Sequence, residues 1–467
     1  MNSNPQNSYS GWHSKIAGYF NFNRLQTNFR TEILAGVTTF MTMAYILVVN
    51  PLILSDAIFL NQSGDLFSEL VVATGISAAI GTFIMALLAK YPFAQAPGMG
   101  LNAFFAYTVV LGLGIDWRLA LSSVLIEGLI FIILTLTDIR RQIIKAIPLS
   151  LKNATAAGIG LFIAYIGLSG NPETGGAGII IANEVTKTAF GSLKEPTTLM
   201  AVIGLFITAA FVVRNIKGAL LWGILATALL GWIFNITPWP TGLFEIPPFP
   251  QNLFGQAIVG IFNIKIDNLF DFIAITFVFL FVDLFDTIGT LTGLGTKVGY
   301  IDDNGELPRA NKALMADAVA TSAGAILGTS SVTTYIESAS GISEGGRSGF
   351  TALITAFIFG ISIFFIPIIQ AIPAYATAPT LVIVGVFMLS SIRYIQWQDL
   401  GEAIPAFLTL FMIPLTYSIA EGLSIGFISY PIIKSFQGKA DEVAKLTWIL
   451  AGVFILRFVF MTFQFNN

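Results

Sequence analysis

Phe281-Val-Asp283-Leu-Phe-Asp286-Thr287-Ile-Gly-Thr290-Leu-Thr-Gly293 ends an apolar run that is too hydrophobic for the surface of a soluble protein. Asp283 and Asp286, three residues apart, share one helical face, and Thr287 and Thr290 extend that polar stripe. A carboxylate inside a membrane span costs several kcal/mol unless it is paired, hydrated or bound to a ligand. Two carboxylates on one face of a span therefore indicate a functional site.

Another intramembrane carboxylate, Glu337, lies in Ser330-Ser-Val-Thr-Thr-Tyr-Ile-Glu337-Ser-Ala-Ser-Gly341. We predict that these two stretches are two walls of one binding site and that the rest of the chain houses it. Glu127 and Asp317 are further carboxylates within apolar segments, and we expect them to form structural pairs among the spans, with a direct functional role as the alternative.

The composition is that of a polytopic membrane protein. Of 467 residues, 55% are hydrophobic and 10% are charged, whereas soluble domains carry about 25% charged residues. The chain has no cysteine, and its one histidine, His13, lies in the polar N-terminal tail. Disulfides, thiolate metal sites and histidine proton relays in the membrane are therefore excluded. We expect no metal, no cofactor, no nucleic-acid partner and, because residues 1–30 lack an apolar core, no cleaved signal peptide.

Apolar segments of about 17–25 residues, the length of a membrane span, recur along the whole chain. The first series lies at approximately 32–51, 68–89, 95–113, 117–137, 149–169, 197–213 and 217–236. After a connector, 237–268, the second series lies at approximately 269–293, 312–328, 330–343, 348–372, 377–392, 403–418 and 422–434. A last apolar segment, about 446–463, carries Arg457 and is either an extra span or an interfacial helix.

Lysine and arginine predict the orientation, because they concentrate in cytoplasmic loops. With a cytoplasmic tail at 1–30, one side of the membrane receives Arg30, Lys90, Arg140, Arg141, Lys145, Arg214, Lys217, Lys297, Arg309, Lys312, Arg347, Arg393 and Lys434. The loops on the other side, around 51–66 and 237–268, are poor in both residues. An odd number of spans in each half inverts the second half relative to the first, as an inverted repeat requires.

A weak internal repeat supports this inversion. Ser77-Ala-Ala-Ile-Gly-Thr82 resembles Ser322-Ala-Gly-Ala-Ile-Leu-Gly-Thr329, and each precedes a span interrupted by small residues and turn formers. In the first half, Pro97, Gly98 and Gly100 together destabilise a continuous helix by several kcal/mol. Irregular backbone survives at membrane depth only where it is buried in protein or lines a cavity. Interrupted spans at matching positions in two halves indicate a transporter binding site.

Four stretches resemble the AzgA-like purine permeases, the hypoxanthine/guanine/adenine branch of the nucleobase–ascorbate transporter superfamily. They are Thr31-Glu-Ile-Leu-Ala-Gly-Val-Thr-Thr-Phe-Met-Thr-Met-Ala-Tyr-Ile, 96–107, 281–293 and Thr333-Thr-Tyr-Ile-Glu-Ser-Ala-Ser-Gly-Ile. The resemblance covers nearly the whole chain. It implies an all-α polytopic membrane protein of about fourteen spans, with a short strand in each of the broken spans three and ten.

The resemblance also implies how the chain is divided. Two inverted seven-span repeats would occupy 31–236 and 269–435, followed by a C-terminal segment, 436–467. A core domain would comprise about 31–145 plus 269–372, and a gate domain about 146–236 plus 373–435. The implied activity is import of a purine nucleobase with a proton by an elevator-like movement, in a homodimer in the cytoplasmic membrane.

Carried over residue by residue, the resemblance places the acidic substrate residues at Asp286 and Glu337. Relatives in the uracil and urate branches have a longer glutamate at the first position, and some have a histidine nearby. The shorter aspartate of this chain fits a larger, two-ring ligand.

Such a ligand presents ring N–H donors, and a carboxylate makes hydrogen bonds about twice as strong as those of a neutral acceptor. Asn102 adds a donor and an acceptor. An aromatic ring could stack on the base, with Phe105 and Phe285 as alternatives to Phe104. The expected substrate-binding residues are Asp286, Glu337, Asn102, Phe104, Thr287 and Thr334.

Proton coupling requires a carboxylate, because no histidine lies within a span. The candidates are Asp283, Asp286 and Glu337, and the sequence leaves the choice among them open. The Asp283/Asp286 pair is the first candidate, since carboxylates one helical turn apart repel and one of them then binds a proton more readily.

Other functional classes fit the sequence less well. Asp286-Thr-Ile-Gly-Thr-Leu-Thr292 resembles the phosphorylation motif of P-type ATPases, but its second residue is not lysine and no soluble insert for ATP exists. An intramembrane aspartyl enzyme would need a second facing aspartate, usually in a Gly-x-Gly-Asp motif, which is absent. The main alternative is a transporter of the same architecture for xanthine, a pyrimidine or an anion. Opposing carboxylates argue against an anion.

Overall fold

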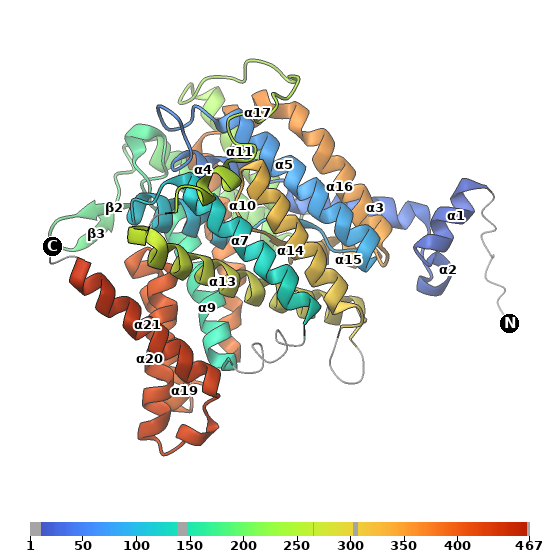
Figure 1. Ribbon diagram of the computed structural model, residues 1–467. Helices are drawn as coiled ribbons and strands as arrows, with labels where there is room; N and C mark the ends of the chain where they lie inside the picture. Colours follow the sequence, from blue (N-terminus) through green and yellow to red (C-terminus); the bar gives the residue numbers. More distant parts are fainter. Residues whose placement is uncertain (1–10, 138–146, 265, 302–306, 465–467) are drawn as a thin grey trace.

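The computed structural model describes residues 11–137, 147–264, 266–301 and 307–464, and it is largely helical (Figure 1). Each predicted span coincides with a helix, with consecutive helices or with a strand followed by helices. Three of the basic residues that predict the orientation, Arg140, Arg141 and Lys145, lie outside the described residues.

The spans of the first half follow in chain order. They are α3 (Phe29–Met43) with α4 (Ile46–Ser55), α5 (Phe67–Ile84) with η1 (Met85–Ala89), β1 (Gln95–Pro97) with α6 (Met99–Ala103) and η2 (Phe104–Gly112), α7 (Trp117–Leu136), α9 (Leu149–Leu168), α10 (Pro196–Val213) and α11 (Ala219–Ile233).

The second half repeats this order. Its spans are α13 (Ile266–Val298), α14 (Ala310–Leu327), β4 (Val332–Thr334) with α15 (Ser338–Ser343), α16 (Gly349–Ser362) with η4 (Ile363–Phe365) and α17 (Ile366–Ala371), α18 (Ala374–Leu389) with η5 (Ser390–Tyr394), α19 (Leu400–Thr416) and α20 (Ile419–Phe436).

Length and apolarity alone identify only part of this set. In the described residues, eight helical stretches are long and apolar enough to cross a membrane, and Met99–Gly112, Ala219–Ile233 and Leu400–Thr416 are shorter apolar helices. The predicted spans at α14 and α20 are more polar, because α14 carries Asp317 and α20 carries Glu421 and Lys434.

Several elements were not predicted. They are α1 (Trp12–Tyr19), α2 (Phe22–Leu25), the hairpin of β2 (Ile180–Asn183) and β3 (Lys187–Phe190), and α12 (Gln256–Ile261) in the connector. The C-terminal segment forms α21 (Lys445–Gln464), which packs along α20. There the Arg457 guanidinium donates to the Glu421 carboxylate at 2.7 Å, which compensates the charge that interrupts this apolar segment.

The two halves meet at a pair of short strands. β1 and β4 pair antiparallel, with Gln95 opposite Thr334 and Pro97 opposite Val332, so both predicted strands are confirmed. Every residue of these two strands is buried. Gly98, directly after β1, allows the close approach, because an added Cβ would lie 2.9 Å from the Thr333 methyl carbon.

A threonine from the preceding span holds each strand in the same way. On α5, Thr82 Oγ1 accepts from the N–H of Gln95 at 2.8 Å and donates to its carbonyl at 2.9 Å. On α14, Thr321 Oγ1 accepts from the N–H of Val332 at 3.1 Å and donates to its carbonyl at 2.9 Å. The structural counterpart of Thr82 is thus Thr321, whereas the weak internal repeat in the sequence aligned Thr82 with Thr329.

The helices form two groups. In the strand group, α3, α5, α7, α13, α14, α15 and α16 pack on one another around β1 and β4. In the flanking group, α9, α10, α11, α18, α19 and α20 pack together. With α4 and α6 counted in the strand group, the groups touch where α6 meets α9, α4 meets α18, α11 meets α3 and α13 meets α20. In Figure 1 the red α19 and α20 of the flanking group extend away from the strand group.

We expect Thr82→Val and Thr321→Val to lower the free energy of unfolding by similar amounts. Valine keeps the shape but leaves a buried N–H and carbonyl of a strand unpaired, at a cost of about 1–3 kcal/mol for each unsatisfied group. Thr135→Val is the matched control, because that buried hydroxyl donates only to a carbonyl of its own helix, at 2.8 Å. Thermal unfolding in detergent measures the difference. A melting temperature equal to that of the control for either strand-holding variant would contradict the proposed role of the threonines.

Candidate functional site

The candidate site lies where β4 ends and α15 begins, beside α13. Glu337 is the residue directly before α15, and Asp286 projects from α13 toward the same region. Both side chains are half-buried, and the two carboxylates are close enough for their charges to interact. Thr333 Oγ1 of β4 lies 3.4 Å from Asp286 Oδ2, a long hydrogen bond. The structure thus brings together the two carboxylates that the sequence singled out.

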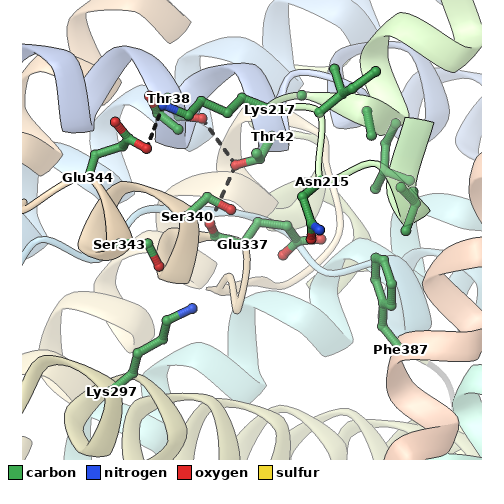
Figure 2. Close-up of a pocket in the computed structure, with 15 residues that line it drawn as sticks. Thr38, Thr42, Asn215, Lys217, Lys297, Glu337, Ser340, Ser343, Glu344 and Phe387 are labelled. Atoms are coloured by element: carbon green, nitrogen blue, oxygen red, sulfur yellow. Dashed lines mark hydrogen bonds and ion pairs between the residues drawn. The ribbon is translucent and has the colours of Figure 1, made fainter. Parts of the chain in front are cut away.

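Glu337 lines a cavity of about 390 Å³ between the two helix groups. Figure 2 shows Thr38 and Thr42 of α3, Ser340 of α15 and Phe387 of α18 around it. The hydroxyl of Tyr45 donates to Glu337 Oε1 at 2.6 Å, which fixes one oxygen of this carboxylate and leaves the other available. Cavities of about 300–1,000 Å³ are typical of small-molecule sites.

Two glycines reduce the bulk of the α13 face beside Asp286. Gly289 and Gly293 follow Asp286 on this face at helical spacing, and both are exposed. A Cβ added at Gly289 would meet no atom within 4 Å. A flat ligand could therefore lie against this part of the helix without a steric clash.

Asp317 of α14 holds the polar residues behind the site. It is fully buried and accepts from Thr287 at 2.9 Å, from Thr334 at 3.2 Å and from the Gln95 amide at 3.0 Å. The predicted substrate residues Thr287 and Thr334 therefore direct their hydroxyls to Asp317, away from the cavity. Because Gln95 and Thr334 are opposite each other on β1 and β4, Asp317 also fixes the register of the strands.

Asn102 and Phe104 lie deeper than the sequence suggested. Asn102 is fully buried, and its amide donates to Asn50 Oδ1 at 2.9 Å, while its own Oδ1 has no partner in the described residues. Phe104 is 1% exposed and packs edge-on against Phe279, with 5.0 Å between the two ring centroids. Neither residue lines the cavity that contains Glu337.

Asp283 is also fully buried, and the carboxyl group that faces it most closely is that of Glu127 on α7. The expected Asp283/Asp286 proximity is present as a weaker electrostatic contact along α13.

Sequence reasoning missed Tyr45 as the partner of Glu337. A signal was available, because a buried tyrosine hydroxyl in an apolar span needs a hydrogen-bond partner. Sequence reasoning also did not predict that the Gln95 amide and two threonine hydroxyls donate to the same carboxylate, that of Asp317.

An ion pair bridges the two helix groups at the mouth of the cavity. Lys217, between α10 and α11, lies 2.6 Å from Glu344 at the end of α15, and both line the cavity (Figure 2). Lys297 of α13 lines the same opening. Among the described residues, no three His, Asp or Glu side chains are arranged to hold a metal ion.

The sequence profile of the Permease family matches residues 30–425. The chain belongs to this permease family. A Methanocaldococcus jannaschii protein whose name describes it as a permease is 53% identical over 448 residues, which cover 96% of this chain and 99% of that protein. Guanine/hypoxanthine permease PbuG of Bacillus subtilis is 44% identical over 454 residues, which cover 95% of this chain and 99% of that protein. Adenine permease AdeP of Escherichia coli is 40% identical over 436 residues, which cover 93% of this chain and 94% of that protein.

Solved structures show the same fold at low sequence identity. The transmembrane domain of the cyanobacterial bicarbonate transporter BicA superimposes with a TM-score of 0.59 at 16% identity, covering 85% of this chain and 97% of that domain. This likeness concerns the fold alone, and it confirms the predicted seven-plus-seven membrane architecture. The chain is thus a multi-pass membrane permease and not an enzyme.

We expect Asp317→Asn to destabilise the permease, because an amide replaces one acceptor oxygen with a donor. At least one of the three donors to Asp317 would lose its acceptor, at a cost of about 1–3 kcal/mol. Asp116→Asn is the control, since that exposed side chain accepts only from the first turn of α7 and from a neighbouring arginine. Thermal unfolding in detergent compares the two, and an Asp317→Asn protein as stable as the control would remove Asp317 from this structural role.

Proposed function

We propose that this permease imports purine nucleobases, with hypoxanthine and guanine favoured over adenine. The observation that carries the proposal is the pair of half-buried carboxylates, Asp286 and Glu337, that face one region beside the cavity. Relatives named as guanine/hypoxanthine and adenine permeases, aligned over nearly the whole chain, support the same substrate class.

The chemistry of the site supports a purine in particular. A purine base is planar, and its ring N–H groups need acceptors when the ring is desolvated. Asp286 and Glu337 offer charged acceptors, and the glycine-lined face of α13 offers a flat surface. A site built to hydrogen-bond a polar edge rejects analogues that lack this edge far better than an apolar pocket rejects a change in size. Asn102, Phe104, Thr287 and Thr334 then act by supporting the site from behind.

We further propose that the strand group is the core domain and the flanking group the gate domain, and that the core moves against the gate like an elevator. The cavity lies between the two groups and is bridged by Lys217 and Glu344. Lys217 is 57% exposed, and such an ion pair contributes only about 0–1 kcal/mol. Movement therefore meets little resistance from this contact.

The proposal includes proton symport, a homodimeric assembly and a cytoplasmic N-terminus in the cytoplasmic membrane. A proton is the simplest coupling ion for a site of carboxylates, and the positions of lysine and arginine support the orientation. The family resemblance supports the dimer.

Another solute is the main alternative. Xanthine or a pyrimidine also presents ring N–H groups, and these would find the same carboxylate acceptors. An anion is disfavoured, because Asp286 and Glu337 would repel it.

Uptake of labelled hypoxanthine, guanine and adenine into cells that lack purine permeases tests the assignment. We expect all three to compete, with the 6-oxo purines binding more tightly, because their N1–H donates to a carboxylate where adenine presents an acceptor. Xanthine, uracil and bicarbonate serve as competitors in the same assay. If none of the three purines is transported and one of these competitors is, the purine assignment is wrong.

Glu337→Gln should weaken purine binding more than tenfold, since a hydrogen bond to a charged group contributes about 1.5–3 kcal/mol. Glu402→Gln is the control: Glu402 also accepts from a tyrosine, Tyr430, at 2.7 Å, and it lies in the flanking group. Lys434, which pairs with Glu402 at 2.7 Å, keeps a second ion-pair partner, Asp399, at 3.2 Å. Equilibrium binding to the purified proteins measures both. Wild-type affinity in a folded Glu337→Gln protein would assign Glu337 a structural role only.

A further inference from the structure

Glu127 and Asp283 form a buried pair of carboxyl groups behind the substrate site. Both are 0% exposed, and they lie within hydrogen-bonding reach of each other, where α7 packs against α13. Among the described residues, no N–H or hydroxyl group donates in good geometry to either oxygen of Asp283 or to Oε1 of Glu127. The other oxygen of Glu127 accepts from Ser331 Oγ at 3.1 Å.

The groups that face this pair bring no positive charge. From α14 they are Thr321 and Asp317, and from α13 the nearby charge is that of Asp286. The Thr321 hydroxyl is engaged twice with the backbone of Val332, and its hydrogen points to that carbonyl. Asp317 differs from the pair, because it already accepts from three side chains.

Two adjacent carboxylates in such surroundings cannot both be ionised cheaply. Each buried charge costs several kcal/mol in lost hydration, and the two charges repel each other. One proton between them removes one charge and supplies the donor that Asp283 lacks. Two carboxyl groups this close titrate as one unit.

We propose that Glu127 and Asp283 together carry the coupled proton, and that Glu127 is therefore a working residue of the transport cycle although it does not line the cavity. The inference rests on the proposed proton symport and names its site. In each cycle the pair takes one H⁺ from water on the outer side and releases it to water on the cytoplasmic side, with no other bond made or broken.

The position of the pair explains how it communicates with the substrate. Asp283 is one helical turn from Asp286, and Ser331, which donates to Glu127, directly precedes β4, whose Thr333 contacts Asp286. A purine N–H bound to Asp286 stabilises the ionised form of that carboxylate. The negative charge then makes it harder for the pair to lose its proton, so substrate and proton are retained together, as reciprocal coupling requires.

The functional test uses the full-length protein in liposomes, with labelled hypoxanthine. In Glu127→Gln an amide N–H replaces the shared proton and cannot be released. We expect this variant to bind hypoxanthine and exchange it across the membrane at wild-type level, and to lose accumulation driven by a pH gradient. Asp283→Asn should behave in the same way, and Glu402→Gln should accumulate normally. Accumulation by Glu127→Gln at wild-type level overturns the proposal, as does loss of binding and exchange in both pair variants when they are folded.

A second measurement does not depend on the substrate. Infrared difference spectra of the purified protein should show the carbonyl band of a protonated carboxylic acid at neutral pH, shifted by deuterium exchange. The band should be weaker or absent in Glu127→Gln/Asp283→Asn and unchanged in Glu402→Gln. An unchanged band in the double variant overturns the shared proton even if purine transport is confirmed. If no purine is transported, a band lost with the pair still supports the proton site, and the proposed function alone fails.

Discussion

Backbone pairing between the two broken spans is the constraint on which this structure depends. A polypeptide that leaves helical geometry inside the bilayer exposes N–H and carbonyl groups that lipid cannot satisfy. Here β1 and β4 form backbone hydrogen bonds with each other. Thr82 and Thr321 form hydrogen bonds with the backbone N–H and carbonyl of the first residue of β1 and β4, respectively. Neither half of the chain provides both strands, so each broken span needs the other half. The inverted repeat is therefore held together where it is least regular.

This pairing also determines where the polar side chains gather. Once β4 is fixed beside α13, Thr333 reaches Asp286, and Glu337, three residues beyond the strand, faces the cavity. Asp317 then connects α14 to both strands through Gln95 and Thr334. A binding site on rigid strands and helix ends keeps its geometry when the surrounding helices move, which suits the elevator-like movement that we propose.

The sequence predicted the broken spans because proline and glycine report backbone geometry directly: the strands lie at Gln95–Pro97 and Val332–Thr334, inside the two segments predicted to be interrupted. It also singled out Asp286 and Glu337 as candidates, since a carboxylate in an apolar run is conspicuous. It did not predict which partner each polar atom selects. Thr287 and Thr334 share a span with the site but direct their hydroxyls to Asp317. Such choices depend on how helices from both halves are rotated, and local sequence does not encode this rotation.

The carboxyl groups of the strand group differ in their burial and in their donors, and the proposed mechanism gives them different tasks. Asp317 accepts from three side chains on α13, β1 and β4, and it therefore serves as a fixed anchor between these elements. Glu337 and Asp286 are half-buried and have one side-chain donor each, which leaves oxygen atoms free for a ligand. Glu127 and Asp283 are fully buried, and among the described residues Ser331 donates to Glu127 whereas Asp283 has no donor. In the proposed mechanism, anchoring, ligand binding and proton binding fall to three sets of carboxyl groups, which differ in their burial and in their donors.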